Sequence, residues 1–144
     1  MKKILVAVDF SDLATLVINY AIKQAKAFGS EILILHVEPP VPAYLGNEIS
    51  PPSLSENLAE EVDRIRGDLD AMVRFVKEKG IGVTYEFIQG PIVDTIVEEA
   101  SKNESDMIIM GAHNNGFLYR AFIGSISSGV MKISHCSVLI IPEK

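Results

Sequence analysis

Five short apolar runs, rich in β-branched residues, constrain the fold of this chain more than any other feature of its sequence. They occupy Lys3–Val8, Glu31–Val37, Gly82–Gln89, Asp106–Met110 and Ser137–Ile141. All but the third are apolar almost throughout, which is typical of parallel strands covered by helices on both faces. The third run alternates more between polar and apolar residues, which predicts a strand at an edge of the sheet.

Four stretches in which apolar residues recur every three or four positions separate these runs, and each predicts a helix. Their apolar positions extend from Leu13 to Ala27, from Leu54 to Val76, from Ile92 to Ala100 and from Ile126 to Ile133. The order β-α-β-α-β-α-β-α-β predicts an α/β fold with a doubly wound, Rossmann-like sheet of five parallel strands and four helices on its two faces.

Single residues at the ends of the predicted helices support their boundaries. Gly29 and Gly80 follow the first two helices, where glycine commonly ends a helix. Ser53 and Glu56 offer a capping box to the second helix. Pro91 is expected in the opening turn of the third helix, where its missing N–H costs nothing.

Length, charge and cysteine content exclude several classes of protein. The 144 residues fit one domain, residues 1–144. A formal net charge of −6 argues against a broad nucleic-acid-binding face. No apolar run approaches the roughly 18–20 residues of a membrane span. The single cysteine, Cys136, cannot form an internal disulfide and favours a reducing compartment. We therefore expect a cytoplasmic protein without nucleic-acid or membrane partners.

The connection Glu38–Pro52 is unusual because it holds five of the seven prolines. Connections longer than roughly 12–15 residues without regular structure are uncommon and often functional or disordered. This one follows the carboxyl end of the second predicted strand, the edge at which doubly wound sheets bind ligands. A lid over a site and a mobile surface excursion are both compatible with the sequence.

The residues that follow the strands are the candidates for chemistry. Asp9 and Asp12 follow the first strand, and a glycine-bearing stretch from Gly111 to Gly116 follows the fourth. Gly124 and Ser125 then precede the last predicted helix, whose N-terminus would present unpaired N–H groups to an anion. An ordinary glycine loop with a serine N-cap fits the same residues. No Walker-type phosphate loop and no G-x-S-x-G elbow is present, and His36, His113 and His135 lack metal-ligand spacing.

Five segments, taken in order, resemble the universal stress protein family along nearly the whole chain. They are Lys3–Ser11, Leu35–Val37, Gln89–Pro91, Asp106–His113 and Cys136–Ile141. The resemblance implies the strand order 3-2-1-4-5 of adenine nucleotide alpha hydrolase-like folds. It also implies a nucleotide motif of Gly, two residues, Gly, nine residues and Gly-Ser. Gly111 and Gly124-Ser125 match it, whereas Asn114 replaces the second glycine.

By this resemblance, a binding site for ATP or another adenine nucleotide, with or without Mg²⁺, would be formed by twelve residues: Ala7, Val8, Asp9, Val37, Met110, Gly111, His113, Asn114, Gly124, Ser125, Ile126 and Ser127. Asp9 would bind the ribose, Val37 the base, and the last four residues the phosphates. Alternatively, Asp9 caps the turn at Ser11-Asp12, and Val37 and Met110 are core residues.

The resemblance also implies a homodimer in which the last strand, with Val138, Leu139, Ile140 and Ile141, pairs with its copy. A buried strand within one chain has the same composition. The predicted function is nucleotide binding as a stress-response switch or sensor with little or no turnover. A homodimeric interaction module without nucleotide is the alternative. A slow nucleotide hydrolase would need a metal-positioning carboxylate, for which Asp9 and Asp12 are the candidates.

Overall fold

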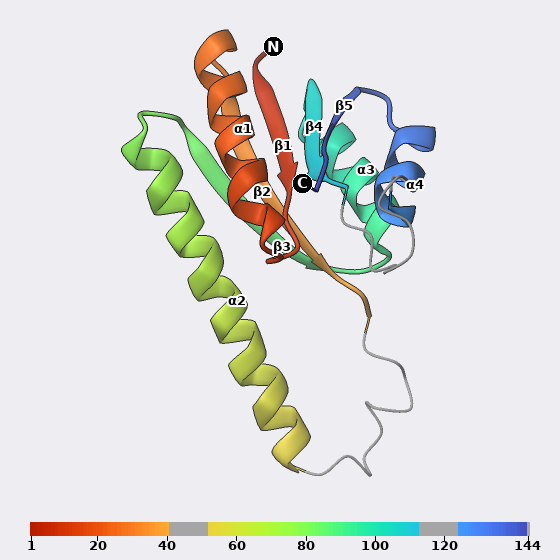
Figure 1. The fold of residues 1–144 in the computed structure, drawn as a ribbon. Coiled ribbons are helices and arrows are strands. Elements are labelled where there is room, and N and C mark those ends of the chain that lie inside the picture. The colour runs from red at the N-terminus through yellow and green to blue at the C-terminus, as the bar shows by residue number, and fades with distance from the viewer. Residues whose placement is uncertain (41–51, 113–123, 144) are drawn as a thin grey trace.

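The computed structural model describes residues 1–40, 52–112 and 124–143, with the backbone alone at 52–56. Five strands and four helices alternate along it (Figure 1). Their bounds are β1 Lys3–Ala7, α1 Leu13–Phe28, β2 Glu31–Glu38, α2 Pro52–Glu78, β3 Val83–Gln89, α3 Ile92–Lys102, β4 Met107–Gly111, α4 Ser125–Ile133 and β5 Ser137–Ile141. All neighbouring strands are parallel, in the order β3-β2-β1-β4-β5. The predicted fold class and strand order are confirmed.

The sheet separates two apolar layers, because successive side chains of a strand point to opposite faces. In β1, Ile4 and Val6 belong to the layer that also holds buried residues of α1 and α2. Leu5 belongs to the other layer, with Ile96 of α3 and Val130 of α4. The two helix pairs accordingly cover opposite faces of the sheet (Figure 1). Both faces of β1 are therefore buried, which is why its sequence is apolar from Ile4 to Ala7.

Strand β3 lies at one edge of the sheet, as its alternating sequence predicts. Strand β5 lies at the other edge and pairs only with β4 among the described residues. Between them, β1 is flanked by β2 and β4, and the chain order reverses at this central position. The carboxyl ends of β1 and β4 thus diverge toward different connections, which is the arrangement that opens a crevice in doubly wound sheets.

The helix ends agree with the sequence except at two prolines. Gly29 has a φ of 67° and its N–H donates to the carbonyl of Ala25, which closes α1. Gly80 has a φ of 79° shortly after α2. Helix α2 begins at Pro52, before the predicted cap at Ser53, and the side chains of the capping box lie outside the described residues. Pro91 is the N-cap of α3, one position before the predicted place.

No helix in the described part of the chain combines the length and the hydropathy that crossing a membrane requires.

Candidate functional site

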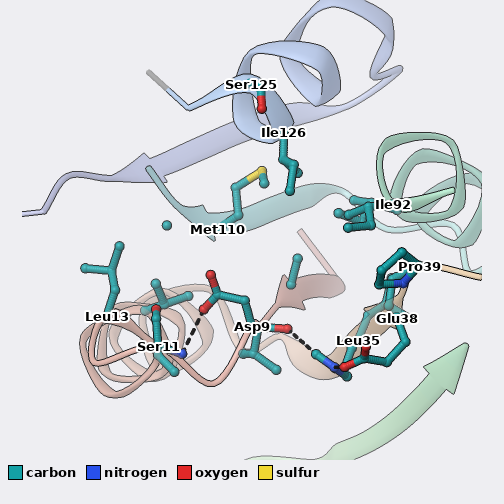
Figure 2. A pocket seen from close by; sticks show the side chains of 18 residues that line it. Asp9, Ser11, Leu13, Leu35, Glu38, Pro39, Ile92, Met110, Ser125 and Ile126 are labelled. Atoms are coloured by element: carbon teal, nitrogen blue, oxygen red, sulfur yellow. Dashed lines mark hydrogen bonds and ion pairs between the residues drawn. The ribbon is translucent and has the colours of Figure 1, made fainter. Parts of the chain in front are cut away.

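A cavity of about 420 Å³ opens at the carboxyl ends of β1, β2 and β4 (Figure 2). Helix α1 borders it on one side, and the N-termini of α3 and α4 border it on the other. Most of the predicted nucleotide-site residues line this cavity, although they come from four elements far apart in sequence. They are Ala7, Val8, Asp9, Val37, Met110, Gly111, Ser125 and Ile126.

The remaining predicted residues have different positions. Gly124 is the buried N-cap of α4 and does not line the cavity. Ser127 is 2% exposed, and its hydroxyl donates inward to the carbonyl of Gly124 at 3.0 Å. His113 and Asn114 lie outside the described residues, as do positions 41–51 of the proline-rich connection. The structure therefore leaves the predicted lid and the Asn114 replacement as expectations.

The carboxylate of Asp9 stabilises the turn that follows β1. Its Oδ1 accepts a hydrogen bond of 3.0 Å from the backbone N–H of Ser11 (Figure 2). This Asx-type turn is the local role that the sequence offered as an alternative, and it leaves Asp9 in the cavity wall. Asp12 is the N-cap of α1, makes no side-chain cap and does not line the cavity. Of the two candidate metal-positioning carboxylates, only Asp9 is therefore at the site.

The backbone of β2 continues past the end of β1, and this leaves part of its edge facing the cavity. The last bond between the two strands is donated by the N–H of Val8 to the carbonyl of Leu35, at 3.0 Å. Alternate residues of a strand direct their backbone groups to the same neighbour, so Val37 turns its N–H and C=O toward the side of β1. No bond joins Val37 to β1 among the described residues. A donor and an acceptor thus stand side by side at the cavity wall.

His36 is a member of the site, although its spacing in the sequence indicated only that it lacks a metal-ligand partner. It is 5% exposed and lines the cavity. Its Nδ1 lies 2.7 Å from the carbonyl oxygen of Val8, and its Nε2 lies 2.7 Å from Oε1 of Glu38. The lining also includes residues outside the predicted site: Ser11, Leu13, Ala14, Val17, Leu35, Glu38, Pro39, Ile92 and Ile96. The carboxyl-end position of His36, Glu38 and Pro39 was the available signal for these three.

Gly111 has a structural role besides the one that its motif implies. An added Cβ would lie 2.4 Å from Cδ2 and 3.1 Å from Cγ of Leu13, in the first turn of α1. With any other residue in place of Gly111, the side chain of Leu13 would have to shift. This close approach of β4 to α1 also brings the backbone of β4 into the cavity wall.

The electrostatics of the cavity are acidic within the described residues. Asp9 and Glu38 are the carboxylates among the described lining residues, which include no lysine or arginine. The N-termini of α3 and α4, the latter with Ser125 at the wall, attract anions on this side. No cluster of three or more His, Cys, Asp or Glu side chains suited to a metal ion occurs in the part of the chain that the structure describes.

A second hollow, of about 600 Å³ and more open, lies at the opposite, amino ends of the strands. Asp106 is its best-placed carboxylate, but Oδ2 already accepts the backbone N–H groups of Lys2 and Lys3, at 2.6 and 3.0 Å. These hydrogen bonds, that of Lys3 first, hold the pKa of Asp106 below its usual value. The carboxylate of Asp106 therefore serves the backbone of residues 2 and 3 rather than a ligand in this hollow.

A pair of carboxyl groups between β3 and α3 gives the fold a predictable pH dependence. Glu86 faces Glu99, which is 8% exposed, and Oε2 of Glu86 is buried without a donor among the described residues. Two carboxyl groups can share a hydrogen bond only when one is protonated. That hydrogen bond, and after it burial, raises the pKa of Glu86 above its ordinary value. The folded state thus binds a proton more strongly than the unfolded state, and stability falls as pH rises through the raised pKa.

We therefore expect Glu86→Gln to remove a decline in stability between mildly acidic and neutral pH. The glutamine amide donates to Glu99 at every pH, so the urea midpoint of the variant should change less than that of the parent. Urea unfolding at mildly acidic and at neutral pH measures the change in midpoint. Glu98→Gln, on the exposed face of α3, is the matched control. An equal pH response in parent and Glu86→Gln proteins would contradict the prediction.

Comparisons with known proteins agree with this architecture. The model of the universal stress protein family matches residues 1–142. The universal stress protein MJ0531 of Methanocaldococcus jannaschii is 33% identical over 143 residues, which cover 99% of this chain and 82% of the relative. The solved structure of MJ0577, from the same organism, superposes with a TM-score of 0.81 at 26% identity and covers 99% of this chain and 96% of its own.

Two other solved universal stress proteins were determined with nucleotides. One is a complex with cAMP, with a TM-score of 0.72 at 20% identity, covering 98% of this chain and 96% of that one. The other, from Archaeoglobus fulgidus, is a complex with dAMP, with a TM-score of 0.71 at 21% identity and 98% coverage of both chains. At these identities, the likeness to this chain concerns the fold.

Proposed function

We propose that this chain, which belongs to the universal stress protein family, binds an adenine nucleotide in the cavity at the carboxyl ends of β1, β2 and β4. The cavity volume of about 420 Å³ is in the range of small-molecule sites. The adenine nucleotides in two structural neighbours support the choice of ligand class.

The backbone edge of Val37 is the observation that carries this proposal. Its N–H donates and its C=O accepts, and the two groups are turned toward the same side. Adenine presents an acceptor, N1, beside a donor, the N6 amino group, so both groups find complementary partners. Guanine and hypoxanthine present a donor at N1 and an acceptor at position 6. The N–H of Val37 would then face a donor, and its C=O would face an acceptor. The N–H and C=O of Val37 would be left buried without partners, and this cost discriminates strongly against the wrong base.

Residues of the cavity wall suggest where the ribose and the phosphates of the nucleotide would bind. Asp9, which keeps its second carboxylate oxygen beyond the turn with Ser11, would accept from a ribose hydroxyl. The phosphates would lie at the N-terminus of α4, near Gly124 and Ser125. The hydroxyl of Ser127 is already donated to Gly124, so we assign any phosphate contact of Ser127 to its backbone. His113 and Asn114 remain proposed members of the same site.

In this proposal, the protein acts as a stress-response switch or sensor. The presence or absence of bound nucleotide is the signal, and the nucleotide is turned over little or not at all. The acidic lining predicts that ATP binds with Mg²⁺, which offsets its charge, whereas AMP needs no metal. A cytoplasmic location would keep the free thiol of Cys136 reduced.

Calorimetric titration with AMP, IMP, and ATP with and without Mg²⁺ tests the proposal. AMP should bind at least about tenfold more tightly than IMP, because IMP reverses both hydrogen-bonding groups. Asp9→Ala and Gly124→Val should weaken binding. Asp12→Ala, which alters an exposed carboxylate outside the cavity, should not. Equal binding of AMP and IMP would refute the role of Val37.

The absence of any heat at millimolar nucleotide would favour the alternative function, a protein-interaction module without nucleotide. The apolar residues at the surface around β5 make this the second candidate. Met131 and Ile133 of α4 are each 45% exposed, and Val138 and Ile140 of β5 are half-buried. For either function, we propose a homodimer in which β5 pairs with its copy through the edge that β4 does not occupy.

A further inference from the structure

We infer that His36 is a positioning residue, which keeps the N–H of Val37 available to a ligand by occupying the carbonyl oxygen of Val8. This inference rests on the proposed function, because the N–H of Val37 is the group that would donate to the base. His36 itself would not touch the reading edge of the base. Its effect would pass through the backbone at the point where β1 ends beside β2.

The register of β1 on β2 shows what His36 prevents. Ala7 lies opposite Leu35, and the N–H of Val8 donates to Leu35. In a parallel ladder, the next bond would be donated by the N–H of Val37 to the carbonyl of Val8. That bond is absent among the described residues, and Nδ1 of His36 lies 2.7 Å from the same oxygen. A carbonyl oxygen only accepts, so Nδ1 carries the hydrogen and donates to the oxygen that the ladder would offer to Val37.

The surroundings of His36 hold its ring in this position. Nε2 lies 2.7 Å from Oε1 of Glu38 and donates to it when both ring nitrogens carry a hydrogen, which fixes the second nitrogen. The ring centroid lies 4.4 Å from that of Phe10 and 5.7 Å from that of Phe87. Phe10 has a φ of 61°, in the left-handed region, and there the chain turns away from β2. The histidine therefore satisfies the carbonyl of Val8, the residue after β1, at the point where the two strands separate.

Removing the Nδ1 donor should let the ladder close by one more bond. A buried carbonyl without a partner is costly, and the N–H of Val37 is the nearest backbone group in register to satisfy it. The base would then lose its donor, although no residue in direct contact with it had changed. This consequence separates a positioning role from simple packing.

Three variants of His36 test the inference. His36→Phe keeps an aromatic ring between Phe10 and Phe87 but removes both nitrogens. His36→Asn places an amide donor near the Nδ1 position, and His36→Gln places one near the Nε2 position. We expect about tenfold weaker AMP binding, or about 1.4 kcal/mol, for His36→Phe and His36→Gln, and binding close to that of the parent for His36→Asn. Circular dichroism establishes that each variant is folded.

The ligand supplies a readout that a packing defect would not give. 1-Deaza-AMP carries CH in place of N1 and cannot accept from Val37. The affinity of 1-deaza-AMP should be low and equal for the parent protein and for His36→Phe. The affinity of AMP should be high for the parent protein and should fall to that of 1-deaza-AMP in His36→Phe. A parallel loss of affinity for both ligands would overturn the inference, because it would indicate a general distortion of the cavity.

Amide hydrogen exchange, measured without ligand, separates the inference from the proposed function. In the parent protein, the amide of Val37 should exchange faster than that of Leu35, which lies in the ladder with β1. In His36→Phe, Val37 should become protected. Equal protection of Val37 in both proteins would overturn the inference even if AMP binds. Failure of the parent protein to bind any adenine nucleotide would instead overturn the proposed function, and the exchange result would still decide the role of His36.

Discussion

Replacing Gly111 with alanine is expected to lower the free energy of unfolding by roughly 1–3 kcal/mol, the usual cost of overpacking a buried contact. The new Cβ would lie 2.4 Å from Cδ2 of Leu13, and the side chain of Leu13 would have to move against Val17, whose Cγ2 is 3.6 Å from the same point. Because this contact borders the cavity, nucleotide affinity should fall as well. Thermal or urea unfolding and a titration with AMP measure the two effects.

Gly67→Ala provides the matched control for this substitution. Gly67 lies within α2, where no atom of the described residues stands within 4 Å of an added Cβ. Alanine is the better helix former by about 0.8–1.0 kcal/mol, so this variant should be more stable than the parent. If Gly111→Ala proved as stable as Gly67→Ala, the close approach of β4 and α1 would not be the reason for the glycine.

Ile140→Pro is expected to convert the proposed dimer into a monomer while the fold remains. Ile141 accepts from Ala112 beyond the end of β4, so residues 137, 139 and 141 direct their backbone groups toward β4. The N–H of Ile140 therefore points to the edge that β4 does not occupy, where the second copy would pair. Proline removes that donor and leaves the ladder with β4 intact.

The molar mass in solution, from light scattering after size exclusion, measures this result. Ile140→Val keeps the N–H and the apolar character, and it should remain dimeric. A dimeric Ile140→Pro protein would place the interface elsewhere. A monomeric parent protein would refute the proposed homodimer altogether.

Two details of the site show where sequence reasoning reached its limit. The motif position of Gly111 could be recognised, but its contact with Leu13 could not, because the two residues lie 98 positions apart and meet only when α1 packs on β4. His36 lies near the end of a predicted strand, but its spacing indicated only that it lacks a metal-ligand partner. Its bond to Val8 depends on the exact register of β1 and β2 and on the turn at Phe10, neither of which leaves a periodic signal.

The sequence by itself determined the alternation of strands and helices and the edge position of β3. These follow from periodicity, since burial on one or both faces leaves a pattern of two or of three to four residues. Only the tertiary structure decided which residues after each strand meet in one cavity, and that Ser127 turns inward rather than toward it. It also decided that the N–H and C=O of Val37 face the cavity. These are properties of backbone register and of packing between distant segments, and any side chain of suitable size at position 37 presents the same two groups.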